Sequence, residues 1–309
     1  MHSIFSALGE ETRLRIFFLC KEAELTLTDL CQVLAQSQPR VSRHLRILRQ
    51  AGLLEKHAIG QNMFFRAVRR RPLTLNLIDL IEKHARKHTH LENDTLRMHA
   101  MLDVRATYSD RLARNISNVE KSASFSAPSD ESAFLMLAWL AKQTGMIGRW
   151  LDIGCGSGEL LAALAAYCVE AVGIDRSKER IAIARTRLTR AGHKHCSLRL
   201  ADLYSIPSPD ESFDFITLHR VLNQTEDPER AVTEAARLLT LEGTLAVIDY
   251  TKHSHTILRD QFGHRWLGFT TSELSNWAMI AGLGVKKHTT LSGDQVDSHL
   301  MVFHKNQRT

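Results

Sequence analysis

Hydrophobic positions near the start of the chain predict a series of short helices. Apolar residues are dense between Ala7 and Cys20, which predicts a helix buried over much of its surface. A second helix is expected to begin at Thr26, where capping residues precede apolar positions 27, 30, 33 and 34. A third is expected from Gln38 to Gln50, with Pro39 in its first turn, where a missing N–H is tolerated. Three residues at spacings of four and three form its inward stripe: Val41, Leu45 and Leu48.

Two further apolar runs predict the paired strands of a hairpin. They cover Leu53–His57 and Met63–Val68, and they enclose a polar turn around residues 59–62. Two helices joined by a turn and followed by a hairpin make a winged helix-turn-helix, whose second helix enters the major groove of DNA. Arginine on that helix can pair with guanine and glutamine with adenine, while arginine near the hairpin can meet phosphates. The candidate DNA-binding residues are Ser37, Gln38, Arg40, Ser42, Arg43, His44, Arg46 and Arg66.

The net charge of +6 is concentrated in this same segment. Residues 1–72 hold 12 Lys and Arg against 6 Asp and Glu, whereas the charges balance at 7 of each in residues 73–120 and at 21 of each in residues 121–309. A locally basic surface is the electrostatic footprint of a nucleic-acid binder. The charge therefore favours double-stranded DNA as a partner, with a solvated basic face as the alternative.

These residues resemble a known family of regulators. The stretch LGEETRLRIFFLCKEAELTLTDLCQVLAQSQPRVSRHLRILRQAGLLEKHAIGQNMFFRA is similar to the ArsR/SmtB winged-helix repressors over about residues 3–70, and SQPRVSRHLRILRQAGLL is its most specific part. The resemblance implies operator DNA as a partner. It also implies a homodimer, because in that family a helix after the wing pairs with the first helix, and two-fold operator DNA favours the same arrangement. A winged helix kept only for dimerisation is the alternative.

Composition divides the chain into four parts. The winged helix covers residues 1–72. Residues 73–120 are polar, contain no glycine and form a helical bridge, which is expected to hold dimerisation helices or, alternatively, helices that pack on the second domain. Residues 121–130 are rich in serine and include Pro128, which is typical of a linker. The second domain covers residues 131–309.

Apolar, β-branched runs alternate with helical stretches through the second domain. This alternation predicts an α/β domain of Rossmann-like type, with a mostly parallel seven-stranded sheet and helices on both faces. Helices are expected around residues 131–144, 159–167, 177–190, 227–239 and 271–281. The expected strands are Arg149–Ile153, Ala171–Ile174, Ser197–Ala201, Phe213–Leu218, Thr244–Asp249, Val285–Thr290 and Leu300–His304. In such sheets ligands bind beyond the carboxyl ends of the strands.

A glycine-rich turn with two spaced acids carries the chemistry of this domain. LDIGCGSGEL, residues 151–160, follows one strand and opens a helix, and its glycines let the backbone approach a ligand closely. Asp175 ends the next strand, 23 residues after Asp152, where an acid can accept both hydroxyls of a ribose. Asp202 ends the third strand, where a carboxylate can take an adenine amino group. A nicotinamide cofactor is a weaker reading, because the turn is GCGSG and not GxGxxG.

This set resembles the class I S-adenosylmethionine-dependent methyltransferases over residues 131–309. The resemblance implies S-adenosylmethionine or S-adenosylhomocysteine as the cofactor, with the turn around its methionine part, Asp175 on its ribose, Asp202 and Leu203 on its adenine, and His219 beside the sulfonium. Asp152 has the alternative role of bracing the loop. The residues expected to contact the cofactor are Asp152, Gly154, Gly156, Gly158, Asp175, Arg176, Asp202, Leu203 and His219.

Methyl transfer is an in-line displacement that needs mainly alignment, with a base in some cases. The sequence therefore does not identify a catalytic residue. His219 and His264 are candidates for a base, and a structural role or a polar loop position is the alternative for each. Arsenite methyltransferases hold arsenic with several cysteines, and the cysteines here stand apart, so we reject that substrate.

Other features exclude further classes of protein. No apolar run reaches the ~18 residues of a membrane span, and the start of the chain is too short for a signal peptide. A cytoplasmic protein without a membrane partner is therefore expected. The five cysteines form no CxxC pair, which argues against a disulfide framework and a zinc ribbon.

Three functions remain open from the sequence. The first is a DNA-binding transcriptional regulator whose methyltransferase-like domain binds S-adenosylmethionine or its product. The second is a methyltransferase for a small-molecule acceptor, whose winged helix only dimerises. The third is a protein that does both. Basic charge confined to the winged helix favours the first or the third.

Metal sensing is not expected. Many members of the resembled family carry two thiols in a segment ELCVCDL, and here residues 24–30 read ELTLTDL. Threonine hydroxyls are poor ligands for soft metals. His84 and His88 have the i,i+4 spacing of a zinc pair, but Lys83 and Arg86 beside them are typical of a solvated face.

We therefore predict that micromolar zinc, cadmium or arsenite leaves the affinity for operator DNA unchanged, because Thr26 and Thr28 stand where the thiolates would be. A gel-shift or fluorescence-anisotropy titration with and without each metal measures this. Release of DNA by one equivalent of metal would contradict the prediction and direct attention to His84 and His88.

Overall fold

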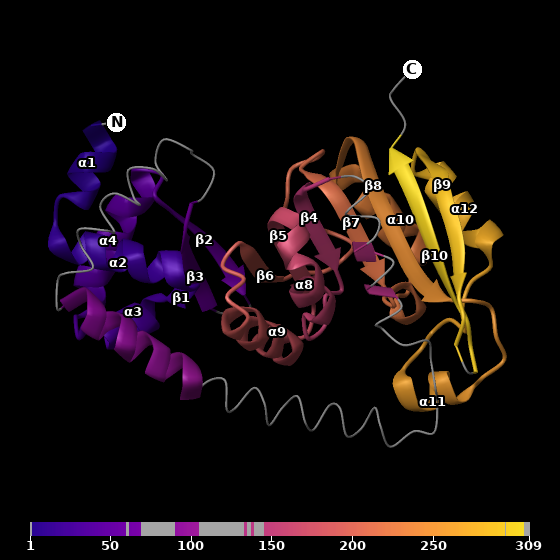
Figure 1. Cartoon of the computed structure of the whole chain (residues 1–309), viewed down its shortest axis with the longest axis horizontal. Helices are drawn as coiled ribbons and strands as arrows, with labels where there is room; N and C mark the ends of the chain where they lie inside the picture. Colours follow the sequence, from indigo (N-terminus) through magenta and orange to yellow (C-terminus); the bar gives the residue numbers. More distant parts are fainter. Residues whose placement is uncertain are drawn as a thin grey trace. The chain divides into compact units, whose positions relative to one another are not determined.

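The computed structural model describes residues 2–59, 62–68, 90–104, 133–134, 137–138, 145–293 and 295–305. The chain divides into two compact units, residues 1–108 and 109–309 (Figure 1), and each is described by itself. The predicted linker at 121–130 and most of the predicted bridge lie outside the described residues. Among the described residues, no helix has the length and apolar character needed to cross a membrane.

The first unit begins with two helices where the sequence predicted one over residues 7–20. Helix α1 covers His2–Leu8 and α2 covers Glu11–Glu22. The helical conformation is interrupted at Gly9 and Glu10, because Glu10 adopts an extended conformation and its carboxylate accepts the backbone N–H of Arg13 at 2.9 Å. The prediction of a single helix was therefore wrong: a side-chain cap starts a new helix inside the apolar run.

The next elements form the helix-turn-helix. Helix α3 covers Leu27–Leu34 and α4 covers Gln38–Gln50, as the sequence predicted. Thr26 and Asp29 cap α3 reciprocally: the Thr26 hydroxyl accepts the N–H of Asp29 at 3.2 Å, and the Asp29 carboxylate accepts the N–H of Thr26 at 2.9 Å. The predicted inward stripe of α4 is confirmed, because all three of its residues are buried: Val41, Leu45 and Leu48.

A three-stranded antiparallel sheet completes the winged helix. Strands β2 (Leu54–Ile59) and β3 (Asn62–Ala67) form the predicted hairpin. The short strand β1 (Leu25–Thr26) pairs with β3, so that the sheet order is β1-β3-β2. Strand β1 was not predicted, because a two-residue strand leaves no periodic pattern in the sequence.

A helix over residues 90–104 belongs to the core of the first unit. Leu91 and Met98 are buried against the helix-turn-helix residues. Asp94 is fully buried and accepts two hydrogen bonds from the Arg15 guanidinium on α2, at 2.6 and 2.9 Å. This part of the predicted bridge is thus fastened to the winged helix by apolar packing and a buried, bidentate ion pair.

The second unit contains the predicted seven-stranded sheet, in the order β6-β5-β4-β7-β8-β10-β9. All neighbouring strands are parallel except β10, which is antiparallel to both of its neighbours. The strands are β4 (Ile147–Ile153), β5 (Cys168–Asp175), β6 (Cys196–Leu200), β7 (Phe213–His219), β8 (Leu239–Tyr250), β9 (Leu283–Leu291) and β10 (Ser298–Lys305). The chain builds outward from β4 through β5 to β6, then returns to β7 on the other side of β4. The order of the strands therefore reverses at β4, where open α/β sheets bind their ligands.

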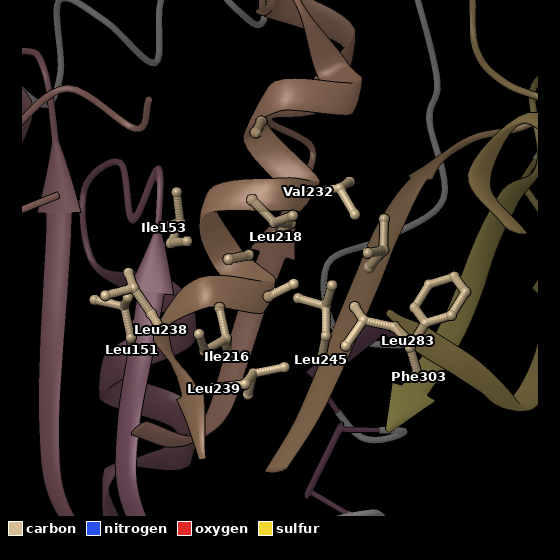
Figure 2. Packing of buried hydrophobic residues seen from close by; sticks show 14 of the residues in the cluster. Leu151, Ile153, Ile216, Leu218, Val232, Leu238, Leu239, Leu245, Leu283 and Phe303 are labelled. Carbon is tan, nitrogen blue, oxygen red and sulfur yellow. The ribbon is translucent and has the colours of Figure 1, made fainter. Parts of the chain in front are cut away.

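Helices cover both faces of this sheet. The described helices are α8 (Glu159–Leu164), α9 (Lys178–Arg190), α10 (Pro228–Leu238), α11 (Ile257–Phe262) and α12 (Thr271–Ile280), with short 3-10 turns at Ala165–Tyr167 and Leu222–Gln224. Helices α10 and α12 share one core with β-strand residues that include Leu151, Ile153 and Ile216 (Figure 2). Helix α8 lies on the opposite face of the sheet. Leu161 of α8 abuts Gly173 of β5, whereas Val172 and Ile174, on either side of Gly173, belong to the core that α10 covers. Successive residues of a strand point to opposite faces, so α8 and α10 lie on different sides.

Candidate functional site

The glycine-rich turn lies between the end of β4 and the start of α8, at the point where the strand order reverses. Gly154, Gly156 and Gly158 have φ values of +73°, +52° and +76°. Side-chain-bearing residues rarely adopt these conformations. The predicted strand–turn–helix context of the motif is therefore confirmed, and its three glycines follow from backbone geometry.

Two of these glycines are also required by close packing. A Cβ added to Gly154 would lie 2.5 Å from the Val221 side chain, and one added to Gly158 would lie 2.9 Å from the Cβ of Ala184. A Cβ on Gly156 would meet no atom nearer than 3.5 Å, at the Arg180 guanidinium. A Cβ would thus collide at either end of the turn, whereas at its centre it would make only an ordinary contact with the Arg180 side chain.

Asp175 ends β5 and faces this turn. Its carboxylate accepts the backbone N–H of Gly156 at 2.9 Å and the N–H of Ser177 at 2.8 Å. The two bonds orient the carboxylate next to the centre of the turn, and they use only part of the acceptor capacity of its two oxygens. Asp175 and the three glycines of the turn, 17 to 21 residues apart along the chain, are therefore brought together as the sequence predicted.

Asp152 is buried beneath the turn. Its carboxylate accepts a hydrogen bond from the Thr217 hydroxyl at 2.6 Å, and that hydroxyl accepts one from the Trp150 indole at 3.0 Å. Burial, helped by the nearby Asp175 and Glu159 carboxylates and opposed by the Thr217 hydrogen bond, raises the pKa of Asp152 to about 7. This chain ties β4 to β7, which supports the bracing role for Asp152.

The remaining predicted cofactor residues lie at the ends of β5 and β6. Arg176 and Asp202 are exposed, and the Asp202 carboxylate accepts the N–H of Tyr204 at 2.9 Å. Leu203 is partly buried against the α10 core. All three follow the carboxyl ends of neighbouring parallel strands, on the same edge of the sheet as Asp175.

His219 ends β7 and packs against an aromatic ring. Its ring stands edge-on to Phe134 at a centroid distance of 5.7 Å. Burial and the charge of Arg220 lower the pKa of His219 to about 3, so the ring is neutral at physiological pH. Arg220 has a φ of +51° and places its guanidinium 5.3 Å from the centre of the Tyr250 ring.

Asn223 and Asp249 form a buried polar hub that no sequence motif predicted. Buried Asn223 donates its backbone N–H and its side-chain amide to the Asp249 carboxylate at 3.2 and 2.8 Å. The Asn223 carbonyl accepts the N–H groups of Arg265 and Trp266 at 2.8 and 3.1 Å. Burial raises the pKa of Asp249 to about 6. The hub fixes the segment after β7 to the segment that carries His264.

His264 is buried and not a loop residue in solvent. Its ring lies 5.5 Å from that of Tyr250. Burial lowers the pKa of His264 to about 4, and the charges of His253 and Arg220 act in the same direction. His219 and His264 are therefore two uncharged imidazoles, one at the end of β7 and the other beside Tyr250 at the end of β8.

The polar face of α4 is exposed and basic. Ser37, Gln38, Arg40, Arg43 and Arg46 are exposed, opposite the buried stripe. No acidic residue lies in the first turn of this helix. The face is therefore basic and open along the length of the helix.

The other three predicted DNA-binding residues differ from these. Ser42 is partly buried. The His44 side chain is only 11% exposed and lies 3.5 Å from the Glu10 carboxylate, between α4 and the start of α2. The Arg66 side chain is 12% exposed and forms an ion pair with Glu55 on β2. His44 and Arg66 thus take part in the packing of the winged helix.

Two family models match the chain. The model of the arsR family of bacterial regulatory proteins matches residues 10–56, and that of a methyltransferase domain matches residues 151–247.

Known relatives match the same two regions. The arsenical resistance operon repressor of Escherichia coli is 47% identical over 64 residues, which cover 20% of this chain and 55% of that protein. The uncharacterized methyltransferase YcgJ of Bacillus subtilis is 31% identical over 116 residues, which cover 38% of this chain and 46% of that protein. The chain thus spans about half the length of the curated relatives it matches. The crystal structure of YcgJ aligns with a TM-score of 0.51 at 20% identity, over 58% of this chain and 100% of that one, which shows the shared fold.

The chain is therefore a winged-helix domain joined to a Rossmann-like transferase domain. More specifically, it combines an ArsR-type helix-turn-helix with a class I methyltransferase domain. Domains of this class use S-adenosylmethionine, and methyl transfer leaves S-adenosylhomocysteine.

The buried carboxyl of Asp152 generates a pH-dependent prediction. Its ordinary pKa is 3.8 and its folded pKa is about 7, so between these values the folded protein keeps a proton that the unfolded chain has lost. The stability of the folded state therefore falls as the pH rises through this window. We expect the wild type to lose stability relative to Asp152→Asn between pH 5 and pH 8.

Denaturant unfolding followed by tryptophan fluorescence measures this difference, because all four tryptophans lie in the second unit. Asp260→Asn, at an exposed carboxylate on α11, is the matched control and should track the wild type at both pH values. An Asp152→Asn difference that is the same at pH 5 and pH 8 would contradict the prediction.

Proposed function

We propose that this chain is a homodimeric, cytoplasmic transcriptional regulator of the ArsR type whose methyltransferase domain binds S-adenosylmethionine or S-adenosylhomocysteine, and whose DNA affinity depends on that ligand. The observation that carries the proposal is the coexistence of two preserved sites in one chain. One is a recognition helix with an exposed basic face, and the other is a glycine turn backed by Asp175.

The residues around the turn suit the proposed ligand. Gly156 leaves the centre of the turn without a side chain, Asp175 has remaining acceptor capacity for ribose hydroxyls, and the exposed Asp202 carboxylate can accept an adenine amino group. Leu203 offers an apolar surface to the adenine ring. We assign these residues, with Gly154, Gly158 and Arg176, to cofactor binding, and Asp152 to bracing the turn.

The bound cofactor would supply an electrophilic methyl group. The chain would then have to align a small-molecule acceptor with it. His219 and His264 are neutral because burial lowers the pKa of both. They can accept a hydrogen bond from a hydroxyl or amine and orient it, but a base with so low a pKa removes a proton poorly. We therefore assign them to positioning of the acceptor.

Coupling requires the ligand to favour one arrangement of the dimer over another. Typical coupling free energies are about 1–3 kcal/mol, or about 5–150-fold in affinity, and the effect is reciprocal. We therefore expect the operator affinity measured with S-adenosylmethionine or with S-adenosylhomocysteine to differ from the operator affinity measured without ligand. Operator DNA should change the ligand affinity by the same factor.

The test compares operator binding without ligand, with S-adenosylmethionine and with S-adenosylhomocysteine. Asp175→Ala should abolish ligand binding and the ligand effect while leaving ligand-free DNA binding intact. Asp202→Ala, at an exposed carboxylate, provides a second variant if the first one disturbs the turn. If both ligands bind and neither changes operator affinity, the sensor proposal fails and a methyltransferase with a separate DNA-binding or dimerising head replaces it.

The basic face of α4 yields a separate prediction. Arg43→Ala and Arg46→Ala should each weaken operator binding, by about 1–3 kcal/mol for a residue that contacts a base. The reason is that both side chains are exposed on the polar face of the recognition helix. Anisotropy titrations on the operator and on a scrambled duplex distinguish the two kinds of contact. Loss of a base contact relaxes sequence specificity, whereas loss of a phosphate contact does not.

Arg259→Ala, an exposed arginine on α11 of the other unit, is the matched control for loss of one positive charge. It should bind the operator as the wild type does. Wild-type affinity in both α4 variants would show that this helix does not enter the groove.

A further inference from the structure

Helix α9 contacts the glycine turn along one of its faces. Arg180, Ala184 and Arg187 are spaced i, i+4 and i+7, which places them on a single stripe of the helix. Arg180 lies beside Gly156, and Ala184 abuts Gly158. Arg187 donates a hydrogen bond from Nη1 to the Ser157 carbonyl at 2.5 Å. Three consecutive residues of the turn thus each meet one member of the stripe.

Hydrogen bonds from different elements fix the peptide groups of this turn. The N–H of Cys155 donates to the Ile174 carbonyl at 2.8 Å, and the N–H of Gly156 donates to Asp175 at 2.9 Å, so β5 holds the first half. The peptide group between Ser157 and Gly158 is held at both ends. Its N–H donates to the Cys155 carbonyl at 2.9 Å, and its carbonyl oxygen accepts from Arg187.

Arg187 is itself held in place. The same Nη1 lies 2.5 Å from the Glu159 carboxylate, in the first turn of α8. Its side chain is about one-third exposed, at 35%. The guanidinium therefore sits at the rim of the turn, between the carbonyl that it orients and a carboxylate that orients it. The ordinary alternative is a basic residue in the last turn of a helix, where it offsets the helix dipole.

We propose that Arg187 is a positioning residue for the cofactor: it fixes the orientation of the Ser157–Gly158 peptide group and so presets the turn in the shape that binds S-adenosylmethionine or S-adenosylhomocysteine. Without this bond the glycines, which have the widest conformational freedom, leave the turn to be ordered by the ligand at a cost in affinity. The inference rests on the proposed binding of this ligand. Arg187 has no proposed contact with the sulfur of the ligand, so its replacement should weaken the binding of both ligands alike.

The experiment measures the dissociation constants of both ligands by calorimetry for the full chain. Arg187→Met keeps the aliphatic stem and removes the charged donor. We expect it to weaken both ligands by about tenfold, as the loss of one charge-assisted hydrogen bond suggests. Arg187→Lys, which keeps a donor, should recover part of the loss. Arg190→Ala, in the same last turn of α9, is the control for loss of a charge near the helix end and should bind as the wild type does.

Operator binding supplies a second readout that a general loss of stability would not reproduce. In Arg187→Met the ligand concentration that gives half of the effect on DNA should rise by the same factor as the dissociation constant, while the full effect at saturation is unchanged. Tryptophan-detected unfolding of the ligand-free variant should follow the wild type closely.

The outcomes separate this inference from the proposed function. If the wild type binds neither ligand, the proposed function itself fails. If the wild type binds and Arg187→Met binds equally well, only the role of Arg187 is overturned. An equal loss in Arg190→Ala would show a helix-dipole effect in place of positioning. A variant that loses its fold would also overturn the proposal, because Arg187 would then be a general structural residue.

Discussion

The reversal of strand order at β4 is the constraint on which the second domain depends. Because β5 and β7 both pair with β4, the carboxyl end of β4 opens onto two neighbouring strand ends at once. The chain must leave the carboxyl end of β4, turn sharply and enter α8. Glycines with positive φ at 154 and 158 allow that turn, since a Cβ at either position would collide with Val221 or Ala184. Every contact of the proposed site starts from this geometry.

Buried polar groups hold the site together from beneath. The Trp150–Thr217–Asp152 chain links β4 to β7, and the Asn223–Asp249 hub links the segment after β7 to the end of β8. Buried polar groups are stabilising only when they are hydrogen-bonded. These two networks therefore specify how the loops leave the sheet, and apolar packing by α10 and α12 supplies the bulk of the core.

The winged helix divides its residues in a similar way between packing and recognition. The apolar stripe of α4 is buried, and the exposed residues on its other faces carry the basic charge. His44 and Arg66 resemble recognition residues in sequence, yet each lies beside an acidic residue of a neighbouring element. The role of a basic residue on a predicted DNA-binding surface can therefore be assigned only once the acidic residues near it in space are known.

The sequence by itself determined the order and type of most elements, the glycine turn, and the pairing of that turn with Asp175, because periodic apolar patterns and local turn chemistry are short-range signals. It also determined the inward and outward faces of α4. Strand β1, the burial of His264 and the contacts of Thr217, Asn223 and Arg187 were decided only by the tertiary structure. These features depend on residues that meet across large sequence separations: Thr217 is 65 residues from Asp152, and Arg187 is 30 residues from Ser157. No local pattern encodes such contacts, because strand register and helix placement, set by packing of the whole sheet, bring the partners together.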